Sequence, residues 1–201
     1  MARFTGKSVI VTGGASGIGR STALAFAAEG AKVMVADQNG AGAEAVAEAI
    51  RAAGGMAASF RADISLYVDC QALVDHAVAR FGGLHVAFNN AGIPGSMTKA
   101  VHEYDLEEWN RMITVNLTGV FHSLKAEVPA MLASGGGAII NTASVATSSI
   151  DATTDDDTAS ASFEVTPPGS GSGCAGDWSL LRPNMIREPS RCERPPCHVV
   201  C

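Results

Sequence analysis

A glycine-rich stretch near the N-terminus, residues 12–20, constrains the fold of this chain more than any other part of its sequence. A short β-branched run, Val9–Val11, leads into it, and after Gly19 the apolar residues fall at helical spacing, at positions 23, 24, 26 and 27. Glycines let the backbone turn sharply and pass close to a ligand, and free N–H groups at the start of a helix attract negative charge. The order of strand, glycine loop and helix therefore predicts a dinucleotide site with the pyrophosphate at the loop. A glycine-rich turn that binds nothing is the competing interpretation.

The same stretch nearly matches a second phosphate-binding pattern. Residues 14–21 read Gly-x-x-x-x-Gly-Arg-Ser, close to the loop that holds the phosphates of nucleoside triphosphates. That loop needs a lysine on the β- and γ-phosphates, and Arg20 stands in its place. We therefore favour a dinucleotide over a nucleoside triphosphate.

The overall charge narrows the class of partner. The chain of 201 residues has a net charge of −6, and it contains no basic run, which argues against nucleic acid or an anionic membrane as a partner. Its hydrophobic content of 47% is ordinary and suits one α/β domain. No apolar stretch reaches the length of a membrane span, and Arg3 and Lys7 flank a strand rather than a secretory core. We therefore expect a cytoplasmic protein.

The character of the sequence changes near Ala146. Up to that residue, ten Lys and Arg stand against twelve Asp and Glu, and strand and helix patterns alternate. From Thr147 onward there is no Lys or Tyr, yet six of the eight prolines and four of the five cysteines lie there. We therefore predict an NAD(P)-binding Rossmann domain over residues 1–146 and a disordered tail over residues 147–201.

The second predicted strand, Lys32–Asp37, ends in an acid. Asp37 lies 24 residues beyond Gly13, close to the distance at which this kind of fold places a carboxylate on the adenosine ribose. An acid there would repel a 2′-phosphate, and the residue before Gly17 is Ser16 rather than a basic one. This pattern favours NAD over NADP, although a solvated acid at a strand end is the simpler alternative.

Helices and strands continue to alternate along the chain. We predict helices over residues 41–53 and 65–81 and from 105 towards 128, with strands over 56–62 and 138–142 and one from 84 that runs into 89–92. Cys70 and His76 are interpreted as packing or surface residues, because no partner at metal-ligand spacing lies near them, and we predict no metal site. The predicted fold class is α/β, a Rossmann-like doubly wound parallel sheet that is incomplete on its C-terminal side.

Two motifs in these positions resemble those of one family. Residues 12–19 follow the pattern Thr-Gly-x-x-x-Gly-x-Gly, and residues 89–92 read Asn-Asn-Ala-Gly. Both are typical of the short-chain dehydrogenase/reductase family. The resemblance implies hydride transfer between NAD(H) and a secondary alcohol or ketone, with Asp63 facing the adenine. The cofactor would then contact ten residues, namely Gly13, Ser16, Gly17, Ile18, Gly19, Asp37, Asp63, Asn89, Ala91 and Gly92.

The resemblance also implies two catalytic residues. Ser144, in Asn-Thr-Ala-Ser-Val-Ala, would hydrogen-bond the substrate oxygen. Asn116 lies inside a predicted helix, where asparagine is unfavourable, so something must compensate. In the family the matching asparagine holds a water on the proton-relay route to the catalytic lysine, and we carry that role to Asn116.

The family pattern stops after Ser144. Its acid–base pair, Tyr-x-x-x-Lys on the next helix, is missing, because the tyrosines are Tyr67 and Tyr104 and the last lysine is Lys125. A phenol has a pKa near 10, so it needs a neighbouring Lys⁺ to exchange protons at neutral pH. Loss of acid–base help costs about 10²–10⁴ in rate. The missing segment would also leave the fifth strand as an exposed apolar edge, which promotes aggregation.

Three interpretations of residues 147–201 remain open. A shifted reading frame is one hypothesis: read from each third base, codons for residues 166–170 can encode Tyr-Ala-Ala-Gly-Lys, and a coding DNA that restores no Tyr-x-x-x-Lys in any frame would end it. A splice or truncation product and a genuine tail are the others. Zinc binding by Cys192, Cys197, His198 and Cys201 is disfavoured by their spacing.

The function prediction follows from this division of the chain. We predict an NAD-dependent oxidoreductase whose hydride transfer is impaired, and a non-catalytic dinucleotide-binding protein or an unstable product are the alternatives. A homo-oligomer is expected of the family but is doubtful for this chain, since the segment that commonly builds the dimer face is missing.

Overall fold

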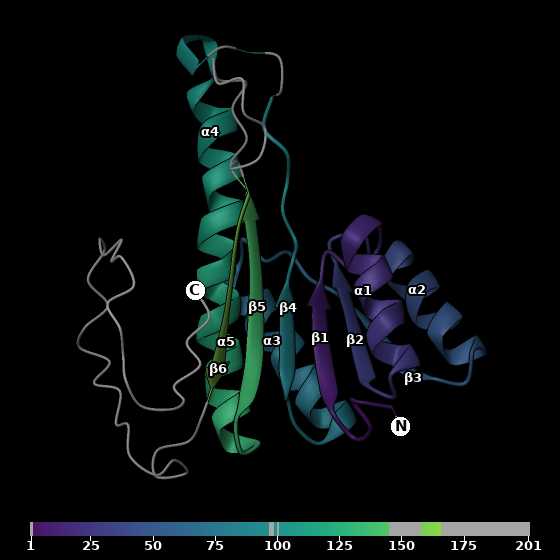
Figure 1. Cartoon of the computed structure of the whole chain (residues 1–201). Helices are drawn as coiled ribbons and strands as arrows, with labels where there is room; N and C mark the ends of the chain where they lie inside the picture. Colours follow the sequence, from purple (N-terminus) through teal and green to yellow (C-terminus); the bar gives the residue numbers. More distant parts are fainter. Residues whose placement is uncertain (1, 97–98, 100, 145–157, 166–201) are drawn as a thin grey trace, which may run out of the picture.

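The computed structural model describes residues 2–96, 99, 101–144 and 158–165, and it is built on one six-stranded sheet (Figure 1). The sheet consists of β1 (Ser8–Thr12), β2 (Lys32–Asp37), β3 (Met56–Arg61), β4 (Val86–Asn89), β5 (Gly137–Ser144) and β6 (Thr158–Val165). The strand order is β3-β2-β1-β4-β5-β6, and the first five strands are parallel. The predicted Rossmann-like α/β fold is therefore confirmed. Its strand order reverses between β1 and β4, where sheets of this kind bind their ligands.

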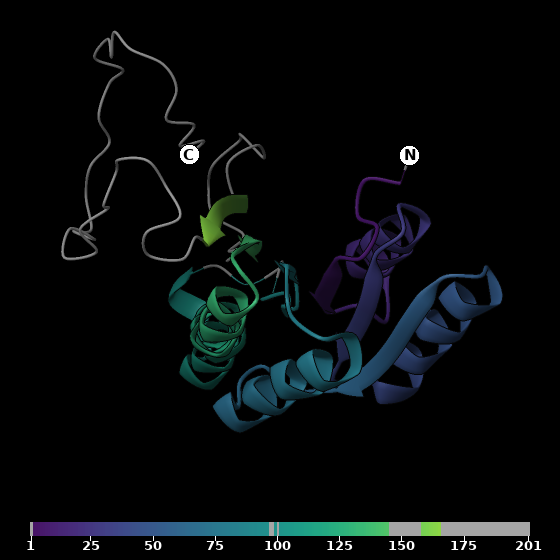
Figure 2. The same ribbon diagram turned by 90° about the horizontal axis from the view of Figure 1, so that it is seen from below.

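Helices cover both faces of the sheet. They are α1 (Gly17–Ala28), α2 (Gly40–Ala52), α3 (Tyr67–Phe81), α4 (Leu106–Ile113) and α5 (Gly119–Ala133), with a short 3₁₀ turn η1 (Val101–Glu103) and a π-helical turn η2 (Thr114–Thr118). Helices α1 and α2 pack on one face, while α3 and α5 lie side by side on the other (Figure 2). No helix in the part of the chain that the structure describes is long and apolar enough to cross a membrane.

The central strands carry apolar side chains in both directions. In β1, Ile10 joins the core under α3 and α5, while Val9 and Val11 join the core under α1 and α2. All three are fully buried. This explains why β1 is a continuous apolar run rather than an alternating one, as is usual for parallel strands covered on both faces.

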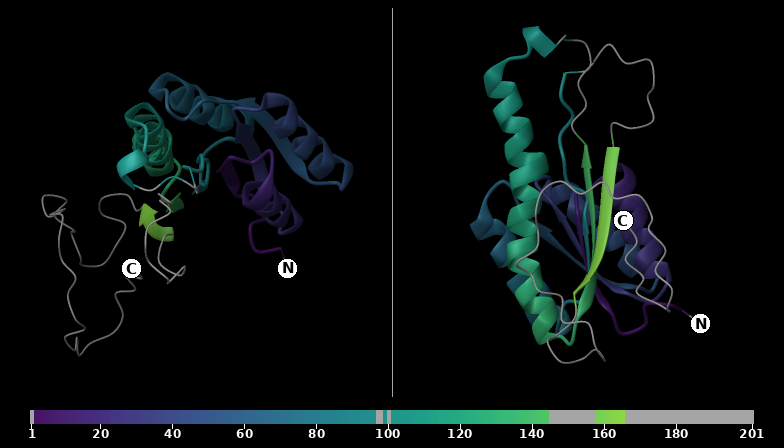
Figure 3. Two further views of the ribbon diagram at one scale, coloured as in Figure 1. Left: turned by 90° about the horizontal axis from the view of Figure 1, so that it is seen from above. Right: turned by 60° about the vertical axis from the view of Figure 1, so that its left-hand side comes forward.

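The far edge of the sheet differs from the expectation. From the sequence, β5 is expected to form an exposed edge, with no ordered element after residue 146. The structure places β6 antiparallel to β5 over its whole length, from Thr158 opposite Ser144 to Val165 opposite Gly137 (Figure 3). The free edge at β5 is therefore a wrong prediction, because β6 pairs with its outer backbone groups. The predicted boundary at residue 146 and the chain beyond residue 165 lie outside the described residues.

The long helix predicted from residue 105 runs from Leu106 to Ala133 and contains one π-helical turn. Asp105 caps α4 by accepting a hydrogen bond from the Glu107 N–H (2.9 Å), and the chain then passes through η2 into α5. Asn116 is the buried residue of η2. The asparagine, which is unfavourable in a regular α-helix, therefore lies in a π-helical turn. The helix extends beyond the predicted end near residue 128, because α5 contains Pro129 and continues to Ala133.

Candidate dinucleotide-binding site

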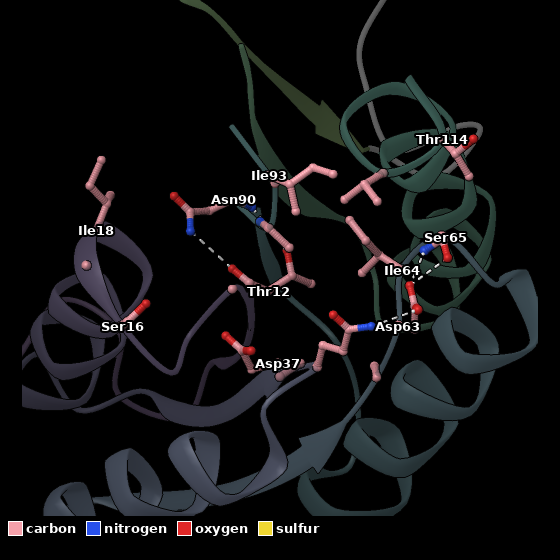
Figure 4. A pocket seen from close by; sticks show the side chains of 18 of the residues that line it. Thr12, Ser16, Ile18, Asp37, Asp63, Ile64, Ser65, Asn90, Ile93 and Thr114 are labelled. Atoms are coloured by element: carbon pink, nitrogen blue, oxygen red, sulfur yellow. Dashed lines mark hydrogen bonds between the residues drawn. The ribbon is translucent and has the colours of Figure 1, made fainter. Parts of the chain in front are cut away.

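A cavity of about 780 Å³ opens at the carboxyl ends of β1, β2 and β4, at the point where the strand order reverses (Figure 4). Its walls come from the glycine loop after β1, from the ends of β2 and β3, from the loop after β4, and from α4 and η2. They are formed by Thr12, Gly13, Ser16, Gly17, Ile18, Ala36, Asp37, Gln38, Ala62, Asp63, Ile64, Ser65, Asn90, Ala91, Gly92, Ile93, Arg111, Thr114 and Val115.

The glycine loop needs its glycines for close approach. Gly13 has a φ of +66°, and a Cβ on it would lie 2.9 Å from the Cα of Ala91. A Cβ on Gly19 would lie 2.1 Å from the Gly13 carbonyl oxygen, so only glycine lets α1 pack against the loop. Gly17 has a φ of +51° with open space at its Cβ position. The loop therefore forms a cradle whose backbone a phosphate group can approach.

The start of α1 is suited to an anion. Ser16 is its N-cap residue, and the Ser16 side chain makes no capping hydrogen bond. No acidic side chain lies in the first turn of the helix, although acids are favoured there. The N–H groups of this turn thus keep their capacity to donate to a phosphate at the cavity wall. Exposed Ile18 lies at the same end of the helix, as Figure 4 shows.

Thr12 ties the two loops of the cavity together. Its Oγ1 accepts hydrogen bonds from the backbone N–H groups of Asn90 (3.0 Å) and Ala91 (3.1 Å). The Asn90 side-chain amide donates to the Thr12 carbonyl oxygen at 3.3 Å (Figure 4). The buried threonine thus fixes the start of the loop after β4 against the end of β1.

Asp37 lies at the end of β2 beside the glycine loop, as its position after Gly13 predicts. Its Oδ2 accepts from the Ala15 N–H (3.0 Å), and its Oδ1 accepts from the Asn39 N–H (2.8 Å). Each carboxylate oxygen can accept a second hydrogen bond, so the group is held in place and still able to receive a hydroxyl donor.

Asp63 lies across the cavity from Asp37, after β3. Its Oδ1 accepts from the Ser65 N–H (2.9 Å) and Oγ–H (2.6 Å), and its Oδ2 accepts from the Gln38 side-chain amide (3.1 Å), as drawn in Figure 4. The Oδ2 atom can accept one more donor at the cavity wall. Sequence reasoning missed Gln38, although it directly follows Asp37.

The structure does not bring Asn89 to the cavity. The Asn89 side chain is 2% exposed and points behind the sheet, where its Nδ2 donates to Glu127 Oε2 (2.9 Å) and to Asn141 Oδ1 (3.0 Å). Asn90, which was not selected from the sequence, lies in the cavity wall instead. The alternation of side chains along a strand places the two asparagines on opposite faces, but it does not say which of them faces the cavity.

Asn116 holds the backbone of Ile93, which lines the cavity. Its Oδ1 accepts from the Ile93 N–H (2.8 Å), and its Nδ2 donates to the Ile93 carbonyl oxygen (2.9 Å). It is also close to Gly92, since a Cβ there would lie 3.2 Å from Asn116 Oδ1. Asn116 thereby holds the loop after β4, and this contact was not foreseen.

Ser144 is the last residue of β5, opposite Thr158 of β6, so its backbone ends at the same edge of the sheet as the cavity loops. Its side chain lies outside what the structure describes. The window after it, residues 145–157, also lies outside the described residues, so the roles predicted for Ser144 and Asn116 stay predictions.

The helical wall of the cavity was also missed from the sequence. Arg111, Thr114 and Val115 line it from α4 and η2. Their only sequence signal is that they precede Asn116 on the same predicted helix. Among the described residues, no group of three or more His, Cys, Asp or Glu side chains gathers as a metal site would require.

Comparison with known proteins agrees with this geometry. The family model described as short chain dehydrogenase matches residues 7–154. The chain is 49% identical over 144 residues to the cyclohexanol dehydrogenase of Acinetobacter sp. (strain SE19), covering 72% of this chain and 57% of that protein. It is 43% identical over 143 residues to the 3-alpha-(or 20-beta)-hydroxysteroid dehydrogenase of Mycobacterium bovis (strain ATCC BAA-935 / AF2122/97), covering 71% and 53%.

A solved structure gives the same result. The crystal structure of levodione reductase superposes with a TM-score of 0.65 at 36% sequence identity, covering 68% of this chain and 54% of that one. The chain thus spans little more than half the length of the relatives that it matches. From the cavity, the glycine loop and these matches together, we conclude that the chain belongs to the short-chain dehydrogenase family.

Proposed function

We propose that the described part of this chain binds NAD(H) in the cavity at the ends of β1, β2 and β4. The glycine cradle would hold the pyrophosphate, Asp37 the adenosine ribose and Asp63 the adenine. The observation that carries the proposal is the joint position of these three features around one cavity. Gly13 and Gly19 also support the assignment of the pyrophosphate to this loop. Neighbouring backbone lies so close to both glycines that a side chain at either position would collide with it.

The choice of NAD over NADP rests on charge. The carboxylate of Asp37 is fixed beside the glycine loop by the N–H groups of Ala15 and Asn39. A second negative group, the 2′-phosphate of NADP, would meet it at short range. Among the described residues of the cavity wall, Arg111 is the basic one, and it comes from α4 rather than from the loop beside Asp37.

The reaction that we propose for the site is oxidation of a secondary alcohol or reduction of a ketone. NAD would accept or return the hydride, and a proton leaves or joins the substrate oxygen. The substrate class is supported by the relatives, two of which are a cyclohexanol dehydrogenase and a hydroxysteroid dehydrogenase. Ser144 would hydrogen-bond the substrate oxygen, and Asn116 would hold the loop beside it.

We further propose that this reaction is impaired in the chain of 201 residues. Its sequence after Ser144 contains no tyrosine and no lysine. Without them the substrate oxygen has no matched proton donor or acceptor, a loss of about 10²–10⁴ in rate. The expected behaviour is saturable cofactor binding with little turnover.

Fluorescence titration with NADH tests both halves of the proposal. We expect saturable binding of NADH, weaker binding of NADPH, and turnover close to background with cyclohexanol and a panel of secondary alcohols. Turnover at ordinary enzyme rates would contradict the impairment. Folded protein without NADH binding would contradict the cofactor assignment, and insoluble protein would support an unstable product.

A further inference from the structure

The carboxyl group of Glu127 is buried away from the cavity and has no part in the proposed reaction. Glu127 lies on α5, and its side chain is 1% exposed. It is the only acidic side chain buried to this degree among the described residues. Burial raises the pKa of Glu127 to about 7, against the opposing effect of the hydrogen bond from Asn89. A buried carboxyl is costly, so its contacts need an explanation.

Those contacts join the ends of two strands. The Nδ2 of Asn89 donates both to Glu127 Oε2 (2.9 Å) and to Asn141 Oδ1 (3.0 Å). Asn89 and Asn141 are opposite each other in the pairing of β4 with β5. Thr142 adds a hydroxyl contact to the Asn89 carbonyl oxygen at 3.4 Å. One carboxyl on α5 therefore anchors an amide that couples both strands from behind the sheet.

The same strands lead directly to the proposed site. The residue after Asn89 is Asn90, which begins the loop in the cavity wall. In this loop, Thr12 accepts a hydrogen bond from the Asn90 N–H, and Asn116 accepts one from the Ile93 N–H. Three residues after Asn141, β5 ends at Ser144. The Asn89 side chain thus lies directly before the point from which the cavity loop departs.

Among the residues that the structure describes, no ion pair joins Glu127 to a basic side chain. On α3, Cys70 has a pKa raised mainly by burial, and the charge of Glu127 adds to that rise. Asn89 and Asn141 approach it from β4 and β5, and the residue of β6 opposite Asn141 is Ala161. Among the described residues, the Asn89 amide is the hydrogen-bond donor that the structure shows for this carboxyl.

We propose that Glu127 is a positioning residue for the dinucleotide site, which it serves by fixing the Asn89 amide and through it the start of the loop Asn90–Gly92. This inference rests on the proposed NAD(H) binding. An apolar residue of similar size would avoid the cost of burying a carboxyl, so packing alone does not account for a glutamate at this position. Apolar replacements of buried charged groups are often neutral or stabilising.

The test compares Glu127→Gln with Glu127→Met. Glutamine keeps an acceptor for the Asn89 amide, whereas methionine fills the space without one. We expect the Gln variant to bind NADH within about twofold of the wild type and the Met variant about tenfold more weakly, a loss equivalent to one hydrogen bond. In the Met variant, amide hydrogen exchange at Asn90 and Ala91 should accelerate, while thermal stability is kept.

Met131→Ala is the matched control, because Met131 is fully buried on the same helix one turn later, whereas the hydrogen-bond partners of the Asn89 side chain are Glu127 and Asn141. It should lower the stability and leave NADH affinity unchanged. If the Met variant of Glu127 does not fold, Asn141→Ala removes the other acceptor of the same amide, and about threefold weaker binding is expected. Wild-type affinity in Glu127→Met or Asn141→Ala overturns the inference.

The two proposals can fail separately. If the wild type binds no NADH, the proposed function is wrong, yet hydrogen exchange at Asn90 and Ala91 is measured without cofactor and still reports the positioning effect. Unchanged exchange in Glu127→Met then contradicts the positioning role.

Discussion

Two regions lie at the same edge of the sheet. The first is formed by the carboxyl ends of β1 and β4 and the second by the carboxyl end of β5, and they differ in how many of the residues expected at the site they contain. At the first, Thr12 fixes Asn90 and Ala91, and glycines allow a phosphate to approach. At the second, Ser144 is followed by sequence with no tyrosine or lysine. In the function that we propose, cofactor binding and proton transfer would therefore come from separate segments, and the first could be complete without the second.

Replacing the second region should give the largest effect. In a chimera, residues 147–201 are exchanged for the corresponding C-terminal part of the Acinetobacter cyclohexanol dehydrogenase, which is 49% identical over the preceding part. We expect a gain of about 10²–10⁴ in the rate of cyclohexanol oxidation, because acid–base help is restored. Steady-state kinetics measures it. The same chimera with Ser144→Ala is the control that should lose the gain, and a folded, NADH-binding but inactive chimera would contradict the comparison.

The link between the two regions can be tested through pH. Because the folded-state pKa of Glu127 is raised to about 7 from 4.5, folding favours its protonated form. Its contribution to stability is full below pH 4.5 and is lost as pH rises towards and through 7. Glu127→Gln should therefore gain stability relative to the wild type over this window, reaching roughly 3 kcal/mol. Denaturant unfolding at several pH values measures this, and a pH-independent difference would show that Glu127 does not titrate there.

The first region should be broken by one methyl group. Gly19→Ala places a Cβ 2.1 Å from the Gly13 carbonyl oxygen, which is too close, so α1 must shift away from the loop. We expect NADH binding to weaken about a hundredfold as the helix N-terminus moves. Gly54→Ala is the control, since Gly54 has a positive φ of +83° with nothing near its Cβ position and lies outside the cavity wall. Equal affinities for the two variants would argue against the cradle.

The smallest effect concerns the choice of cofactor. Asp37→Ser removes the carboxylate that we propose to hold the ribose and places a hydroxyl at the end of β2. We expect NADH to bind about tenfold more weakly and NADPH to bind better, because a nearby repulsive charge is gone. Glu44→Ser, on the outer face of α2 away from the cavity wall, is the charge-matched control. An unchanged ratio of the two affinities would show that Asp37 does not select the cofactor.

Much of the first region could be predicted from the sequence. The glycine spacing, Asp37 and Asn-Asn-Ala-Gly lie on regular strand–loop–helix units, whose local patterns are strong. Asn116 was selected as an anomalous residue inside a helix, but its contact with Ile93 depends on the π-helical turn, for which the sequence has no simple signal.

The failures lie where distant segments meet. Asn89 and Asn90 could be distinguished only by knowing which face of β4 meets α5, and Glu127 was overlooked because a carboxyl on a helix is normally solvated. The pairing of β6 with β5 was missed because edge strands are chosen by tertiary contacts more than by local pattern.

A single sample can test the central claim, in which NADH affinity and alcohol turnover are measured together on the 201-residue protein. The account predicts a saturable change in NADH fluorescence and oxidation of cyclohexanol near the background rate. Oxidation of any alcohol at ordinary enzyme rates by this polypeptide, or folded protein that leaves NADH fluorescence unchanged, would contradict it.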